Sequence, residues 1–254
     1  MIRLPVSGVD ASPRLPNGAD EMAMREMAGP PIVRAIALAE RLAGPSAWPG
    51  GEWADLPVTD FETLMLAIRV QTLGGALTLG LACPACRARI EIGFNLDDYA
   101  AIVEPRRPAG VTPDEDRAGW FRLDGICFRL PTARDQAAVA GRADAVKALE
   151  ARCFDAPRPL ARDRARAERA MAVMAPEVSR PIAGQCPECG SGVEAPLHVS
   201  RLVVGEMVRD AAALPEEVDL IAQAYHWPEA DILALPRARR RAYAERIRNA
   251  RRAA

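Results

Sequence analysis

Two short motifs of the form Cys-Pro-x-Cys constrain this chain more than any other feature. They are Cys83-Pro84-Ala85-Cys86 and Cys186-Pro187-Glu188-Cys189. Each motif supplies two thiolates, and four thiolates in a tetrahedral array suit a zinc ion. Residues 87–185 separate the pairs, far more than the roughly 15 to 20 residues of a usual zinc ribbon. Because closure entropy grows only logarithmically with loop length, the sequence still predicts one zinc held by all four cysteines, with the long segment as an inserted lobe.

The residues around these motifs favour strands rather than helices. Leu77 to Ala82 is apolar, Arg87 to Phe94 alternates, and Gly192 to Leu197 follows the second motif as a short strand. A redox Cys-x-x-Cys motif opens a helix, so this context favours a metal site. A redox pair and fortuitously buried cysteines are the alternatives. Four thiolates leave no open coordination position, which predicts a structural rather than a catalytic metal.

The other candidate ligands are few. Cys127 and Cys153 stand alone on a predicted strand and a predicted helix, and we expect them in the core. His198 follows the second motif closely and is an alternative ligand, although four thiols already complete the site.

The rest of the chain is mostly helical in pattern. Residues 1–29 are rich in breakers and predict a flexible arm. Helices are expected at Pro31–Ala43, from a capping box at Thr59–Glu62 to about Leu73, from Thr132–Asp135 to about Cys153, at about 159–175, and in four segments from about 199 to 252. Trp120 to Leu130 predicts a hairpin that turns at Asp124-Gly125.

Together these patterns predict a helix-rich α+β fold with a four-cysteine zinc-ribbon core. An inserted lobe with a hairpin and two helices is expected at about residues 104–180 of the main domain, 30–213. A C-terminal helical tail spans 214–254.

Composition narrows the function classes. Hydrophobic residues make up 50% and charged residues 26%, which allows a sizeable core. The formal net charge of -1 argues against general polyanion binding. The sequence shows no apolar run of roughly 18 residues and no signal-peptide pattern, so we expect a cytoplasmic protein. A Gly-x-Ser-x-Gly elbow and a P-loop are both missing, which favours a non-enzyme without catalytic residues.

The last predicted helix is strongly basic. Eight arginines between Arg237 and Arg252 face a single acid, Glu245. Such a helix beside a zinc ribbon could bind nucleic acid, and a zinc-ribbon regulator is the alternative function. An acidic protein surface is the other partner that these charges suit.

Four stretches carry a resemblance to a known family. The run Glu217 to Ile247 (EVDLIAQAYHWPEADILALPRARRRAYAERI) combines an aromatic pair, an "ILAL" helix and an Arg-Arg pair before a tyrosine. Phe128 to Asp135 reads FRLPTARD, and the two cysteine motifs fall in the expected order. With these features the chain resembles the baseplate hub assembly chaperones, or T-even-type baseplate proteins, of contractile-tailed phages and contractile injection systems.

The resemblance implies a non-enzymatic assembly factor or structural component that binds baseplate, hub or tail proteins and can be incorporated in the particle. It implies no small-molecule substrate and no membrane. Candidate partner-binding residues lie in the C-terminal helices, and internal packing of the apolar ones is the favoured alternative: Tyr225, Trp227, Ile232, Leu235, Arg239 and Arg240.

Overall fold

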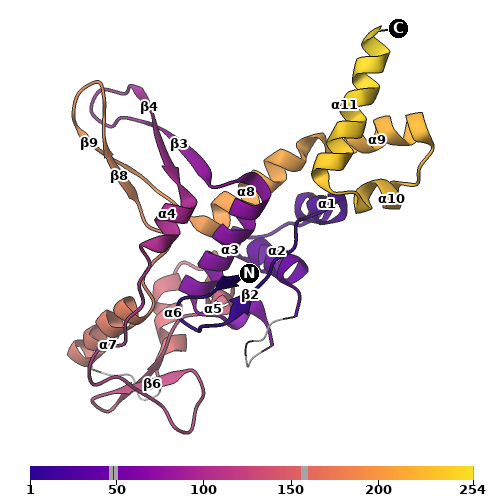
Figure 1. Cartoon of the computed structure of the whole chain (residues 1–254). Coiled ribbons are helices and arrows are strands. Elements are labelled where there is room, and N and C mark those ends of the chain that lie inside the picture. The colour runs from indigo at the N-terminus through magenta and orange to yellow at the C-terminus, as the bar shows by residue number, and fades with distance from the viewer. Residues whose placement is uncertain (46–47, 49–50, 156–159, 254) are drawn as a thin grey trace.

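The computed structural model describes residues 1–45, 48, 51–155 and 160–253 of the chain. A helical body stands at the centre, and a hairpin arm, a small lobe and a helical tail extend from it in different directions (Figure 1). The body contains β1 (Ile2–Arg3), β2 (Asp10–Ala11), α1 (Gly18–Glu26), α2 (Pro31–Ala43), the short helix η1 (Trp53–Asp55), α3 (Val58–Leu73), α5 (Ala133–Val139), α6 (Ala145–Cys153) and α8 (Val199–Asp210).

The other three regions are smaller. The arm contains β3 (Ala76–Ala82), β4 (Arg89–Asn95), β8 (Ile182–Gln185) and β9 (Gly192–Ala195), with α4 (Leu96–Ala101) at its base. The lobe contains β5 (Thr112–Pro113), β6 (Trp120–Leu123), β7 (Ile126–Arg129) and α7 (Ala161–Met174). The tail contains η2 (Ala211–Ala213), α9 (Leu214–Tyr225), α10 (Glu229–Ala234) and α11 (Arg237–Ala253).

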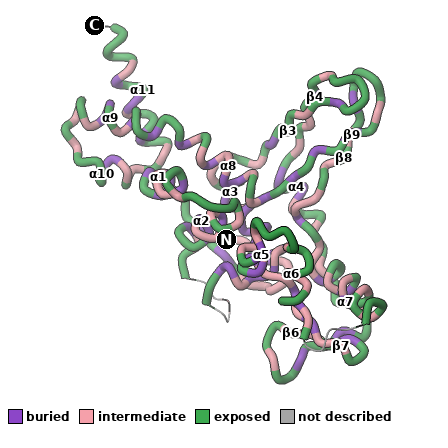
Figure 2. Tube along the Cα trace, turned by 180° about the vertical axis from the view of Figure 1, so that it is seen from behind, coloured by how far each residue is buried: buried purple, intermediate pink, exposed green. Residues whose placement is uncertain are grey.

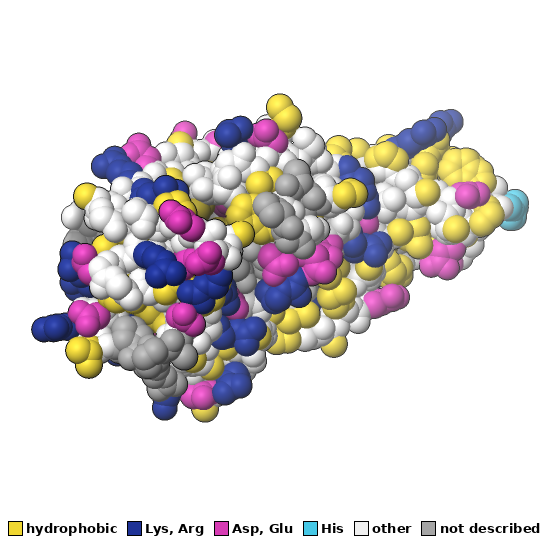
Figure 3. All heavy atoms as spheres, turned by 90° about the horizontal axis from the view of Figure 1, so that it is seen from below, with side chains coloured by type: hydrophobic (Ala, Val, Ile, Leu, Met, Phe, Trp, Pro, Cys, Tyr) yellow, Lys and Arg dark blue, Asp and Glu magenta, His cyan; other side chains and the backbone are white. Residues whose placement is uncertain are grey.

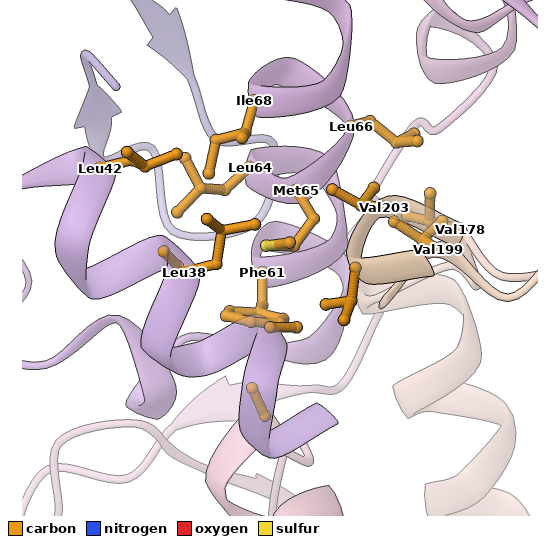
Figure 4. Close-up of a cluster of buried hydrophobic side chains, with 14 of the residues drawn as sticks. Leu38, Leu42, Phe61, Leu64, Met65, Leu66, Ile68, Val178, Val199 and Val203 are labelled. Atoms are coloured by element: carbon orange, nitrogen blue, oxygen red, sulfur yellow. The ribbon is translucent and has the colours of Figure 1, made fainter. Parts of the chain in front are cut away.

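The main hydrophobic core lies between helices of the body. Phe61, Leu64 and Met65 of α3 are fully buried and face Leu38 of α2 (Figure 4). Val203 of α8 closes the other side of the same cluster. The predicted zinc-ribbon core is corrected here: among the described residues the main buried cluster lies around α3, and the four-cysteine hairpins form an arm with a separate small cluster.

Residues 1–29 are ordered, contrary to the predicted flexible arm. Consecutive backbone N–H groups of Val6 and Ser7 each donate to the Asp60 carboxylate at 2.7 Å. Asn17 caps α1 in a reciprocal capping box with Asp20. Leu4 and Met24 enter the core. Pro5 lies in a turn and Pro13 and Pro16 are buried, so tertiary contacts place this segment.

The polar residues that open α3 do not form the predicted capping box. Thr59 donates its hydroxyl hydrogen to the Pro176 carbonyl at 2.8 Å, and Glu62 accepts two hydrogen bonds from Ser179 at 2.6 and 2.9 Å. Pro57 is the N-cap residue and makes no side-chain bond. Burial raises the pKa of both Asp60 and Glu62. The first turn of α3 therefore binds both the N-terminal segment and residues 176–179.

Most of the local predictions are confirmed. The helix Pro31–Ala43 has the predicted bounds. Asp124 and Gly125, both with positive φ, turn the hairpin between β6 and β7, and Thr132 caps α5 in a capping box with Asp135. The helix predicted to run on to Cys153 is broken between α5 and α6, where Gly141 adopts a positive φ of 79°. The predicted start of the next helix, Pro159, lies outside the described residues.

The predicted lobe has a small core of its own. Phe128 is fully buried there against Leu123, Ala167 and Met174. Ala133, which also falls within residues 104–180, belongs to the core of the body instead. The lobe core is therefore made by β6, β7 and α7.

The tail is fastened to the N-terminal helix by buried charges. Arg240 is only 1% exposed and donates to Glu217 at 2.7 Å and to Glu21 of α1 at 2.5 Å. Arg237 donates to the other oxygen of Glu21 at 2.7 Å. The apolar residues of α9, α10 and α11 form a separate cluster around Ile221 and Ile232. The tail thus packs as a small helical unit held on α1 by ion pairs.

Arg240→Ala tests this attachment. Removing the guanidinium leaves the buried Glu21 and Glu217 carboxylates without a shared cation, which costs about 3 to 5 kcal/mol of unfolding free energy. Arg239→Ala is the matched control, because the Arg239 side chain is exposed and its loss should change stability by less than about 0.5 kcal/mol. Chemical denaturation of the full chain measures both values. Equal stability of the two variants would contradict the inferred role of Arg240.

Candidate metal centre and predicted partner face

The two hairpins of the arm bring the four cysteines together. β3 pairs with β4 in register from Ala76–Asn95 to Ala82–Arg89, and the turn that joins them contains Cys83 and Cys86. β8 pairs with β9 from Ile182–Ala195 to Gln185–Gly192, and the turn between them contains Cys186 and Cys189. Sequence analysis missed β8. The hairpins lie side by side along the arm (Figure 1), so both cysteine turns lie at the same end.

The two turns have the same backbone geometry. In the first, Cys83 N–H donates to Ala88 and Arg87 N–H donates to the Cys83 carbonyl, both at 2.9 Å. In the second, the corresponding bonds join Cys186 with Ser191 and Gly190 with Cys186, also at 2.9 Å. The fourth residue after the first cysteine has positive φ in each, 62° at Arg87 and 72° at Gly190. Glycine, which adopts a positive φ most readily, stands at this position in the second turn only.

The sulfur atoms form a compact cluster. The Sγ atoms of Cys83 and Cys189 are 3.7 Å apart, as are those of Cys86 and Cys186, and all four lie within 4.8 Å of one another. A tetrahedral site with metal–sulfur bonds of about 2.3 Å has sulfur atoms about 3.8 Å apart. A disulfide bond is far shorter, at about 2.05 Å. The four predicted ligands therefore fit a metal ion, and the strand context does not fit a redox motif at a helix start.

Local hydrogen bonds favour the thiolate form over the thiol form in some of these cysteines. The Ser191 hydroxyl and backbone N–H lower the pKa of Cys189 to about 6. The backbone N–H of Cys86 lowers the pKa of Cys83. Although the backbone N–H of Ala88 favours the Cys86 thiolate, hydrogen bonding with Cys189 and desolvation raise its pKa to about 12. Full ionisation of such a cluster needs a cation, and a bound metal supplies it. Ser191 is a supporting residue that sequence analysis did not identify.

The remaining cysteines and His198 lie outside this cluster. Cys153 is buried as predicted, and burial raises its pKa to about 11. Cys127 is not in an apolar core, which corrects the prediction: its thiol lies 3.1 Å from the Asp114 carboxylate and 2.7 Å from Arg117. His198 is exposed and directly precedes α8.

The predicted partner-binding residues largely pack within the tail. Tyr225, Trp227 and Tyr243 form an aromatic cluster with ring centroids 5.2 to 5.7 Å apart. Ile232 is fully buried and Leu235 half-buried. Arg240 is buried in its ion pairs, so its guanidinium has no free surface to offer a partner, and only Arg239 is exposed.

Removing one ligand tests the centre. Cys83→Ser should lose the metal because a neutral hydroxyl replaces a thiolate, and Cys127→Ser should keep it. Elemental analysis by plasma mass spectrometry should give about one metal ion per chain for the unmodified protein and the control. Since thiolate sites of this kind contribute roughly 10 kcal/mol or more to folding, chelation should also melt the arm. Full metal content in Cys83→Ser would contradict the four-cysteine site.

Comparison with known proteins gives a match to one family. Residues 48–157 match the family model described as T4 bacteriophage base plate protein. The match includes α3, the β3–β4 hairpin with Cys83 and Cys86, and the three strands of the lobe but not α7. It ends before Cys186 and before the C-terminal run Glu217–Ile247. No curated protein and no solved structure matches the chain. This match over residues 48–157 confirms the T-even-type baseplate resemblance predicted from the sequence.

Proposed function

We propose that the chain is a non-enzymatic subunit or assembly factor of a phage-type contractile-tail baseplate, where it binds other baseplate, hub or tail proteins. The family match over residues 48–157 carries this proposal. The matched segment includes the central helix α3, around which the body is built, so the likeness extends to the core of the molecule. Within the described residues, no helix is both long and apolar enough to span a bilayer.

The metal that we propose for the arm is zinc in a structural role. The cluster of buried residues that joins the two hairpins is small: it contains Ile90, Val193, Cys83 and Cys186, with Leu81 and Ile92 partly covered. Most residues along the arm are exposed or half-buried (Figure 2). So small a core does not hold two hairpins together by burial alone, and four metal–sulfur bonds supply the missing stability. Four thiolates complete the coordination shell, which leaves no position for a substrate or water.

A nucleic-acid-binding regulator is the second candidate function. The observation in its favour is that Arg246 and Arg252 of α11 have no acidic partner among the described residues. Other arginines of the same helix are neutralised by Glu21, Glu217 or Asp210. Basic and acidic side chains are also intermixed over the visible face of the body (Figure 3). A broad phosphate-binding surface needs an excess of cations instead, so the baseplate function is better supported.

Deletion of the gene in the native host tests the function. We expect electron microscopy to show the loss of complete contractile tails, because a missing baseplate subunit or assembly factor stops baseplate formation. Mass spectrometry of purified particles from the unmodified strain then separates the two roles: a subunit is present at fixed stoichiometry, and an assembly factor is absent. Normal particles in the deletion strain would refute both, and salt-sensitive retention on DNA would then support the second candidate.

A further inference from the structure

The arginines of the basic helix α11 differ in whether a carboxylate elsewhere in the chain pairs with them. Four of its arginines have carboxylate partners elsewhere in the chain. They are Arg237 with Glu21 and Asp210, Arg240 with Glu21 and Glu217, Arg241 with Asp210 and Glu217, and Arg248 with Glu216. Within the described part of the chain, Arg246, Arg251 and Arg252, near the C-terminal end of α11, have no carboxylate partner, and in its first turn neither does Arg239. The uncompensated positive charge is thus concentrated at the end of the tail.

A groove lies beside these arginines. It has a volume of about 360 Å³ and runs between the end of α9 and the end of α11. Ala224, Tyr225, Ile247 and Ala250 make its apolar lining, and Arg246 and Arg251 are its charged residues. The Arg251 guanidinium donates only to the amide oxygen of Gln223, at 3.1 Å. The groove therefore combines an apolar lining with positively charged residues at its edge.

We propose that this groove docks an acidic, amphipathic segment of another baseplate protein. An apolar side chain of that segment fills the space over Ile247 and Ala250, and its carboxylates pair with Arg246, Arg251 and Arg252. The charge complementarity selects the occupant, because no acidic residue lines the groove and a basic or neutral segment would leave the arginines unpaired. The inference rests on the proposed baseplate function and adds the chemistry of the partner.

The same geometry disfavours a nucleic acid as the occupant. Binding of single strands uses aromatic rings with a free face on which bases stack. The ring of Tyr225 already stacks on Trp227 with centroids 5.2 Å apart and meets Tyr243 edge-on at 5.7 Å. The aromatic cluster therefore stabilises the tail, and apart from Tyr225 the apolar lining of the groove is aliphatic.

Photo-crosslinking in the native host tests this proposal on the full chain. The substitution Ala250→p-benzoylphenylalanine places a reactive group at the groove, and adducts formed during particle assembly are mapped by mass spectrometry. We expect one major adduct, on an acidic segment of a baseplate or tail protein. Adding Arg246→Glu and Arg251→Glu should reduce its yield at least about tenfold, because attraction becomes repulsion at two positions.

A control variant with the same change in charge is available. Arg25→Glu with Arg201→Glu reverses two exposed arginines outside the tail and should leave the adduct yield and the assembly of particles unchanged. Thermal unfolding of each variant checks that the tail remains folded. Reversing the mapped acidic residues of the partner to arginine should restore the adduct with the Arg246→Glu and Arg251→Glu variant.

Each outcome distinguishes this inference from the proposed function. An adduct only with nucleic acid, with a second copy of the chain, or with no particle protein overturns the groove assignment. Full complementation of the deletion strain by the Arg246→Glu and Arg251→Glu variant also overturns it, while the baseplate function stands. Normal particles in the deletion strain itself refute the baseplate function, and the groove proposal with it.

Discussion

The buried polar turn that opens α3 holds the body together. Thr59, Asp60 and Glu62 bind the N-terminal segment, Pro176 and Ser179, which are far apart in sequence. Ser179 in turn accepts the N–H of Val199 at 2.9 Å, at the start of α8. A buried carboxylate is costly without hydrogen bonds, so these groups specify where each segment lies. The apolar faces of α2, α3 and α8 can then close over Phe61 and Leu64 in one arrangement.

The tail is attached by a different kind of interaction. Glu21 of α1 and Glu217 of α9 share the Arg240 guanidinium in a fully buried site. A buried ion pair contributes little net stability compared with apolar packing, but breaking it is expensive. We infer that its value is positional, because it fixes the angle at which the tail leaves the body. That angle in turn determines where the C-terminal end of α11 lies, with its arginines that have no carboxylate partner.

In the arm, the proposed metal would take the place of an apolar core. Each hairpin has two strands and little apolar surface to bury, and a two-stranded hairpin is marginally stable alone. The cluster of four sulfur atoms joins the hairpins where burial cannot. The body, arm, lobe and tail are then four structural units with separate clusters of buried residues. Such an extended shape (Figure 1) suits a subunit that contacts several neighbours in an assembly, in agreement with the family match.

Local interactions were determined by the sequence alone. The cysteine turns, the Asp124-Gly125 hairpin, the Thr132–Asp135 cap and the helix Pro31–Ala43 depend on neighbouring residues, so their patterns predicted them. Thr59–Glu62 has the same capping pattern as Thr132–Asp135, but Glu62 bonds to Ser179 instead. Only the tertiary structure decided which of the two patterns forms a capping box, because Ser179 from a distant segment is an equally good partner for Glu62. It likewise ordered residues 1–29, buried Arg240 and left Arg246 free, since burial and charge pairing depend on which segments meet in space.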